Sequence, residues 1–205
     1  MGESKMRKLI VSEFLTLDGV MQAPGSPDED RSGGFNHGGW QMPYFDEIFA
    51  KAIIEGLTEA GGFVLGRKTY EIFAAYWPTA PAEVQAFAGP LNNLPKFVAS
   101  KTMREPLAWN NSTLIAGDVA KEVAKLKRQS GNDLRVIGSG ELVQTLMKHD
   151  LIDEYVLMVH PLVLGSGKRL FREGGSSANL KLIDIKTTGK GVVIVTYQPI
   201  KEEAK

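Results

Sequence analysis

Residues 134–142 read LRVIGSGEL, an apolar strand pattern followed by Gly138-Ser139-Gly140 and the start of a helix. The same order, in which a strand is followed by small or hydroxyl residues, returns in residues 63–69 (FVLGRKT) and 96–102 (KFVASKT). The carboxyl ends of parallel strands lie on one edge of a sheet, so these three turns are expected to converge there. The repeated pattern predicts an α/β fold built on a mainly parallel sheet.

The segments around these turns extend the alternation of strands and helices. Residues 8–16 form an apolar run that predicts a first, largely buried strand. Apolar residues at helical spacing predict a helix from Phe45 to Leu57, with Pro43 in its first turn. Further helices are expected at residues 69–76 and 81–87 and from Asp118 and about Leu142, and further strands at residues 113–116 and 155–164.

The C-terminal part of the chain contains strands alone. Residues 180–186 and 192–197 predict two strands joined through Thr188-Gly189-Lys190-Gly191, which is a hairpin signal. We therefore expect an antiparallel hairpin at one edge of the parallel sheet, with helices flanking the sheet. Residues 1–205 are expected to form one domain, in which residues 1–6 are a disordered extension and residues 199–205 a tail.

The segment of residues 17–42 shows almost no periodicity and is rich in glycine and proline. A loop of this length inside a compact domain is either a lid over an active site or a disordered segment. Met21, Phe35, Trp40 and Met42 give it apolar anchors that a disordered segment would not need. These anchors favour the lid.

The composition excludes several classes of protein. Lysine plus arginine and aspartate plus glutamate both number 24, and a nucleic-acid binder would show a basic excess. Cysteine is absent, which excludes disulfides, thiolate nucleophiles and cysteine-ligated zinc, and fits a cytoplasmic protein. No signal-peptide pattern or membrane-spanning run is present, so a membrane partner is not expected.

The three strand-end turns have the features of a site for a multiply phosphorylated cofactor. Glycine lets the backbone approach a phosphate, and the free N–H groups at a helix start favour an anion. Arg67, Lys68 and Lys101 add positive charge, which suggests an additional phosphate on a ribose. Taken alone, each of these segments could be a structural turn with no role in ligand binding. The third glycine of a Rossmann fingerprint is absent, and so is a P-loop.

Candidates for acid–base chemistry are few. His37, His149 and His160 lack metal-ligand spacing, so no metal site is expected. Asp18 follows the first strand at the start of the long loop and is the strongest candidate, although Asp-Gly is also a common turn. Asp46 stands at a helix start, where it could simply complement the helix dipole. Hydride transfer needs few catalytic side chains, so this pattern favours a nicotinamide-dependent reductase.

The ordered set of motifs resembles the dihydrofolate-reductase-like family, related to the C-terminal reductase domain of the bifunctional riboflavin-biosynthesis deaminase-reductase. The resemblance covers residues 8–199, and it rests on five segments. These are Leu17-Asp18-Gly19, Gly66-Arg67-Lys68-Thr69-Tyr70-Glu71, Ser100-Lys101-Thr102, Gly138-Ser139-Gly140-Glu141-Leu142 and His160-Pro161-Leu162-Val163-Leu164-Gly165-Ser166-Gly167. The riboflavin enzyme has a lysine after Asp-Gly where this chain has Val20, and the deaminase half is missing.

The resemblance implies a dihydrofolate-reductase-like fold and NADPH as the cofactor. Asp18 would be the catalytic residue, and Asp18, Trp40 and Asp46 would contact the substrate. The side chain of Glu141 would point away from the cofactor phosphates. The residues implied to bind the cofactor are Gly66, Arg67, Lys68, Thr69, Ser100, Lys101, Gly138, Ser139, Gly140, Glu141 and Leu142.

The function expected from the resemblance is hydride transfer from NADPH to a pyrimidine- or pteridine-like small molecule. The activity most like it is that of 5-amino-6-(5-phosphoribosylamino)uracil reductase in riboflavin biosynthesis. Two alternatives stay open: dihydrofolate reductase activity, and an NADPH-binding module without turnover. A cytoplasmic homodimer is expected, because the family usually associates and the C-terminal strands offer an edge that a sheet protein tends to cover.

Overall fold

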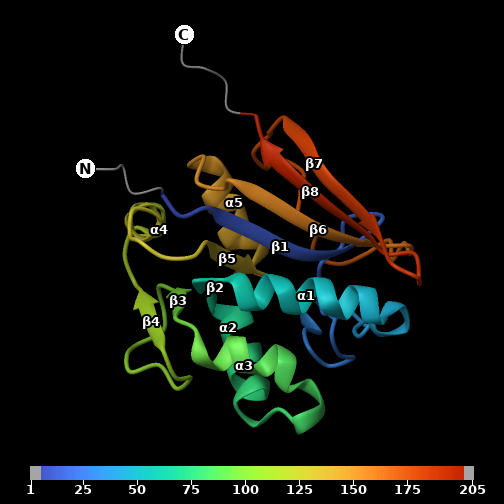
Figure 1. Ribbon diagram of the computed structural model, residues 1–205, viewed down its shortest axis with the longest axis horizontal. Helices are drawn as coiled ribbons and strands as arrows, with labels where there is room; N and C mark the ends of the chain where they lie inside the picture. The colour runs from blue at the N-terminus through green and yellow to red at the C-terminus, as the bar shows by residue number, and fades with distance from the viewer. Residues whose placement is uncertain (1–5, 201–205) are drawn as a thin grey trace.

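The computed structural model describes residues 6–200 and contains one eight-stranded sheet of order β4-β3-β2-β5-β1-β6-β8-β7 (Figure 1). Six strands run parallel, and β8 pairs antiparallel with both β6 and β7. The strand bounds are β1 Leu9–Thr16, β2 Gly62–Gly66, β3 Lys96–Ala99, β4 Ser112–Ile115, β5 Leu134–Ile137, β6 Glu154–His160, β7 Leu180–Thr187 and β8 Val193–Pro199. The sheet is therefore mainly parallel and ends in an antiparallel hairpin, as the sequence predicts.

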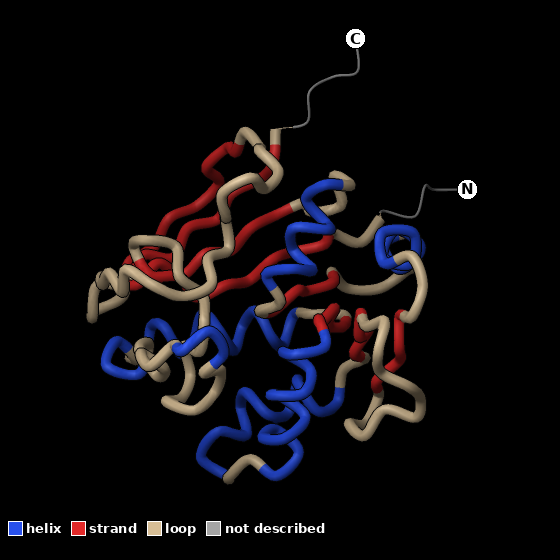
Figure 2. The backbone as a smooth tube through the Cα atoms, turned by 180° about the vertical axis from the view of Figure 1, so that it is seen from behind, coloured by secondary structure: helices blue, strands red, loops and turns tan. Residues whose placement is uncertain are grey.

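Within residues 6–200, five α-helices cover the two faces of the sheet: α1 Glu47–Glu59, α2 Arg67–Tyr76, α3 Gln85–Asn93, α4 Val119–Lys127 and α5 Gly140–Lys148. Helices α4 and α5 pack against β1, β5 and β6 on one face through a large apolar cluster. Helix α1 covers the other face, with α2 and α3 beside it (Figures 1 and 2). Within residues 6–200, no helix is long and apolar enough to cross a membrane.

Several expected elements differ from the structure in their bounds, including the first helix, the helix expected at residues 81–87 and the strand expected at residues 155–164. Pro43 lies in a separate 3-10 turn, Met42–Tyr44, and α1 begins only after Asp46, whose carboxylate accepts a hydrogen bond from Phe49 N at 2.8 Å. Helix α3 extends to Asn93 with Pro90 inside it, and β6 ends at His160, directly before a proline. Of the expected terminal segments, residues 1–5 and 201–205 lie outside the described residues, and Pro199 is the last residue of β8.

The long loop of residues 17–42 packs onto the end of the sheet. Val20, Phe35 and Trp40 are buried in a small cluster, and the Trp40 Nε1 donates to the Gln22 carbonyl at 2.7 Å. Lys168, far along the chain, forms an ion pair with Asp30 of this loop at 2.5 Å. Met42 is 54% exposed, so the expectation that it anchors the loop was wrong. The loop is therefore held partly by residues far along the chain, and no local sequence pattern predicts these contacts.

Candidate active site

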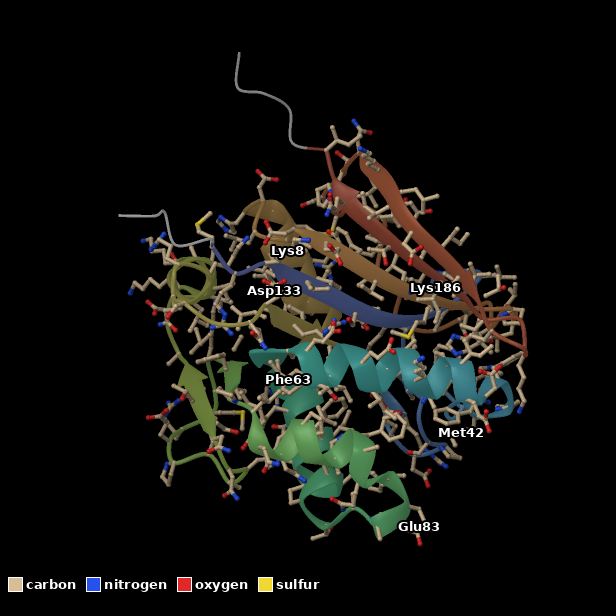
Figure 3. All side chains as sticks on the ribbon, viewed as in Figure 1. Lys8, Met42, Phe63, Glu83, Asp133 and Lys186 are labelled. Atoms are coloured by element: carbon tan, nitrogen blue, oxygen red, sulfur yellow. The ribbon has the colours of Figure 1, made fainter. Side chains whose placement is uncertain are left out.

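A cavity of about 1410 Å³ opens where the carboxyl ends of the central strands meet the long loop and helices α1, α2 and α3. The amino ends of β1 and β5, marked in Figure 3 by Lys8 and Asp133, belong to the opposite end of the sheet. The three turns singled out in the sequence all contribute to the cavity wall. Every residue expected to bind the cofactor lines it, namely Gly66, Arg67, Lys68, Thr69, Ser100, Lys101, Gly138, Ser139, Gly140, Glu141 and Leu142.

Ser139 connects two of these turns. Its Oγ accepts a hydrogen bond from Gly66 N at 2.7 Å and donates to Thr69 Oγ1 at 2.8 Å. The turns approach so closely that a Cβ on Gly138 would lie 2.9 Å from Thr69 Oγ1, and Gly138 also has a φ of +61°. Glycine is required here for both reasons. The β2–α2 and β5–α5 turns are thus held as one unit.

Two of the helix starts at this edge are uncapped. Neither α2 nor α5 has a side chain that accepts from its first-turn N–H groups, whereas α1 and α4 are capped by Asp46 and Asp118. Uncapped N–H groups need a partner, which is water or a ligand. Because the helix dipole adds partial positive charge at the same place, these starts favour a phosphate.

Cations and hydroxyl groups border the same edge. Lys68 and Lys101 are exposed, and neither forms an ion pair within residues 6–200. Arg67 is paired with Glu71 at 3.0 Å one helical turn away. The Ser100 Oγ accepts from Met103 N at 3.1 Å and so shapes the turn that carries Lys101. Two lysines are therefore available to an anion at this edge.

The Glu141 side chain does not face the helix start to which it belongs. Its carboxylate pairs with Arg172, and the side chain is 83% exposed. Leu142, the next residue, is 6% exposed and belongs to the core cluster beneath α5. The first turn of α5 therefore offers mainly its backbone to the cavity.

Asp18 lies outside the residues that line the cavity. Its carboxylate accepts hydrogen bonds from Thr16 Oγ1 at 2.5 Å, from Leu164 N at 3.2 Å and from Gly165 N at 2.9 Å, and pairs with Arg169 at 3.3 Å. The Thr16 hydroxyl, followed by the backbone donors, lowers the pKa of Asp18 to about 2. Asp18 is thus an ionised anchor for the segment after β6, and its catalytic role stays a prediction.

Trp40 and Asp46 also lie outside the lining residues. Trp40 is 6% exposed and packs its ring edge-on against His160 at 5.0 Å between centroids. Asp46 caps α1 and also accepts a hydrogen bond from Lys190 N at 2.9 Å. The structure brings neither side chain to the cavity, so their predicted contacts with substrate stay predictions without geometric support.

The cavity extends from the polar edge into an apolar lobe between the sheet and the helices. Its wall there consists of side chains from α1, α2, α3, the adjacent strands and the segment before α1, including Phe45, Ile53, Phe73, Phe87, Val156 and Met158. Met42 and Glu83, labelled in Figure 3, also line the cavity. An apolar slot lined by aromatic rings beside a cationic edge suits a flat ring joined to phosphate groups.

Two charged residues of this cavity were missed because each lies inside a strand pattern. Arg135 of β5 donates from Nη1 to Ser12 Oγ at 2.6 Å, and burial lowers its pKa. Gly56 of α1 makes room for the guanidinium, since a Cβ there would lie 2.9 Å from Nη1. Glu13 of β1 is 4% exposed, and burial raises its pKa well above the usual range. A charged residue in an otherwise apolar strand was the available signal.

The described residues provide no metal centre. Within residues 6–200, no group of three or more His, Asp or Glu side chains is arranged to hold a metal ion. His160 is fully buried, and its Nδ1 lies 2.9 Å from the Met158 carbonyl and 3.2 Å from that of Leu15. Burial lowers the pKa of His160, so it is a neutral core residue.

The sheet order and flanking helices define a dihydrofolate-reductase-like α/β fold. The model of the RibD C-terminal domain family matches residues 7–194, and the chain belongs to that family. This places it among reductase domains of the type found in riboflavin biosynthesis.

The chain is similar to three known proteins over nearly its whole length. The uncharacterized protein YyaP of Bacillus subtilis (strain 168) is 29% identical over 195 residues, which are 94% of this chain and 95% of YyaP. A putative riboflavin biosynthesis protein from Shewanella sp. PV-4 is 25% identical, with a TM-score of 0.66 and coverage of 95% and 99%. Dihydrofolate reductase from Enterococcus faecalis, in complex with NADP(H), has a TM-score of 0.59 at 15% identity and coverage of 95% and 97%.

Asp18→Asn tests whether Asp18 acts as an anchor or as a catalytic residue. The amide keeps the shape but loses the charge that strengthens the four contacts, so the free energy of unfolding at pH 7 should fall by about 1.5 kcal/mol. The pKa of Asp18 is lowered on folding, so its contribution is present above the ordinary value near 3.9 and is lost as pH falls through about 2. Urea unfolding of the wild type and the variant from pH 7 to pH 2 measures both. Unchanged stability with turnover reduced by about 10²-fold or more would instead support the catalytic role.

Proposed function

We propose that the protein is an NADPH-dependent reductase that transfers a hydride to a pyrimidine- or pteridine-like substrate. The activity most like it is that of 5-amino-6-(5-phosphoribosylamino)uracil reductase. The observation that carries the proposal is the pair of uncapped helix starts, α2 and α5, held side by side at the mouth of an apolar cavity. Membership of the RibD C-terminal domain family supports it.

The polar edge fits the phosphates of the dinucleotide. The pyrophosphate would accept hydrogen bonds from the first-turn N–H groups of α2 and α5, where glycines keep the backbone accessible. Lys68 and Lys101, both exposed, would neutralise phosphate charge, with Lys101 beside the ribose phosphate that distinguishes NADPH from NADH. When bound, the nicotinamide supplies the hydride.

The apolar lobe is the place for the substrate ring. Its walls would exclude water from the reacting carbon, and the aromatic side chains would orient a flat heterocycle. The Arg135 guanidinium lies in this cavity with one hydrogen bond, to Ser12, and with no carboxylate within 4 Å among residues 6–200. It could therefore hold an anionic substituent of the substrate, as a phosphoribosyl group would provide.

Cofactor preference tests the proposal directly. One charged hydrogen bond to the ribose phosphate contributes about 1.5–3 kcal/mol, so NADPH should bind at least roughly ten-fold more tightly than NADH. Lys101→Ala should remove most of that difference. Lys148→Ala changes an exposed lysine at the far end of α5 and serves as the matched control. Fluorescence titration of the wild type and both variants with NADPH and NADH measures the six affinities.

Two results would contradict the assignment of these residues. Equal affinity of the wild type for NADPH and NADH would contradict the proposed role of the lysines in recognising the ribose phosphate. An equal effect of Lys101→Ala and Lys148→Ala would mean that only general charge matters. NADPH oxidation is then measured with aminopyrimidine, pteridine and dihydrofolate substrates. This screen separates the proposed reductase from a dihydrofolate reductase. Tight NADPH binding without oxidation in the whole screen would favour a binding module.

We further propose that the chain forms a homodimer through β7. This strand is one of the two edge strands of the sheet, opposite β4, and both of its faces are exposed (Figure 1). Leu182, Ile183 and Ile185 are 49%, 46% and 56% exposed there. An open strand with apolar side chains is a surface that proteins usually cover.

Light scattering at micromolar concentration tests the dimer. The wild type should give twice the chain mass of 22.4 kDa, and Ile185→Lys should shift it toward the monomer because a charge would be buried in the interface. Ile48→Lys places the same charge on α1, at another half-exposed isoleucine, and should leave the mass unchanged. A wild-type mass of 22.4 kDa would overturn the proposal.

A further inference from the structure

The apolar lobe of the cavity continues along α2 to the turns that join α2 to α3. We call this outer part the aromatic arm. The side chains that line it come from α2, from the 3-10 turns Trp77–Thr79 and Ala82–Val84 and from α3, namely Ile72, Phe73, Tyr76, Trp77, Val84 and Phe87. Phe87 also packs against Phe45, with 6.1 Å between ring centroids, and so joins the arm to the inner part of the lobe. The arm is therefore continuous with the place proposed for the substrate ring.

The rings of the arm are accessible rather than sealed in the core. Tyr76 is 49% exposed. Phe73, Trp77 and Phe87 are half-buried. Trp77 packs edge-on against Tyr76 and Phe73, at 5.0 and 6.1 Å between centroids, so these rings form one continuous wall. An open aromatic wall in a concave site is a surface that a ligand covers, and another aromatic ring packs well against it.

The segment that forms the arm contains no cation. Residues 69–95 have no lysine, arginine or histidine. Lys68 stands in the first turn of α2 and Tyr76 is its last residue, a separation of roughly 12 Å along the helix axis. This separation exceeds the Debye length, which is about 8 Å at physiological ionic strength. The cations at the start of α2 are therefore too far away to neutralise an anion held in the arm.

Arg135 is directed away from the arm. It stands on β5 and donates to Ser12 of β1, and β1 lies on the side of β5 opposite β2. Strand β2 leads into α2, which forms much of the arm. The cations after β6 already pair with acids, since Lys168, Arg169 and Arg172 bind Asp30, Asp18 and Glu141. An anion in the arm would thus find no free cation on these elements.

Negative charge borders the arm instead. Glu83 lines the cavity at the margin of the molecule, and its carboxylate forms no ion pair among residues 6–200 (Figure 3). It also complements the partial positive charge at the start of α3, which directly follows its 3-10 turn. The last turn of α2 has no basic residue to offset the partial negative charge at that helix end. An anionic group here would leave water without gaining a cation, whereas an uncharged ring would gain apolar contact.

We infer that the aromatic arm binds an uncharged aromatic group carried by the substrate ring, and that it rejects an anionic one. This inference rests on the proposed reductase function, whose substrate ring occupies the inner part of the same lobe. It narrows the substrate to a pyrimidine- or pteridine-like ring with an uncharged aromatic extension. An anionic substituent of the same ring would go to Arg135 and not to the arm. Dihydrofolate is disfavoured, because its aromatic extension ends in carboxylates.

The test compares ligands of the NADPH complex that differ only in the group offered to the arm. Methyl, benzyl and 4-carboxybenzyl groups are each attached to C5 of 2,4-diaminopyrimidine and to C6 of pterin. On at least one of the two rings, benzyl should bind about ten-fold or more tightly than methyl, because it buries a phenyl group. The 4-carboxybenzyl group should lose that gain and bind within about three-fold of methyl. Calorimetry on the full chain measures the six affinities.

Phe87→Ala tests whether the gain comes from the arm. The ratio of benzyl to methyl affinity should fall to about three-fold or less, because Phe87 forms part of the wall. Phe171→Ala removes a ring that is 44% exposed and does not line the cavity, so this variant should keep the full ratio. A ratio measured within one variant is insensitive to a general loss of folded protein. If Phe87→Ala does not fold, Phe87→Leu keeps an apolar side chain and should lower the ratio in the same direction.

Glu83→Lys tests the charge selectivity of the arm. The variant should raise the affinity for 4-carboxybenzyl relative to benzyl by about two- to five-fold, as an exposed ion pair would. Glu55→Lys makes the same change at an exposed acid of α1 that does not line the cavity, and it should leave this ratio unchanged. Equal shifts in the two variants would mean that only net charge matters, and would overturn the selectivity assigned to the arm.

The outcomes distinguish this inference from the proposed function. Binding of the methyl compounds without a gain from benzyl, a gain that survives Phe87→Ala, or equal binding of benzyl and 4-carboxybenzyl would overturn this inference alone. Failure of all six compounds to bind the NADPH complex would overturn the proposed function, and this inference with it. A dimer that Phe87→Ala dissociates and Phe171→Ala preserves in light scattering would mean that a second copy of the chain covers the arm, which would also overturn the inference.

Discussion

The Ser139 hydroxyl determines the geometry on which the site depends. By accepting from Gly66 N and donating to Thr69 Oγ1, it holds the starts of α2 and α5 against each other across two neighbouring strands. Each hydrogen bond contributes only about 1 kcal/mol, but together they fix the direction of two sets of free N–H groups. The missing Cβ of Gly138 allows this approach, so the two turns act as a single anion-binding surface.

Burial divides the rest of the cavity into regions with different chemistry. At the outer edge, Lys68 and Lys101 are exposed to solvent, which suits a ligand with several phosphates. Inside, the surroundings of Glu13 and Arg135 disfavour their charged forms, which lowers the pKa of Arg135 and raises that of Glu13.

The sequence predicted the parts of this arrangement that follow from local patterns. Strands β3 and β5 have the expected bounds, Asp118 caps α4 as expected, and the three turns meet at one cavity. The charged residues inside the cavity were not predicted, because the sequence around Glu13 does not show which parts of the chain pack over it. The same limit applies to Asp18, whose partners Leu164 and Gly165 lie 146 and 147 residues away.

The central claim is that the edge joined by Ser139 binds the diphosphate of NADPH, with the nicotinamide in the apolar lobe of the cavity. A crystal structure of the complex with NADPH tests it most directly. The account predicts pyrophosphate oxygens within about 3 Å of backbone N–H groups in the first turns of α2 and α5, and the nicotinamide ring inside the apolar lobe. A cofactor bound elsewhere, or one whose phosphates contact only side chains while the ring stays outside the cavity, would contradict it.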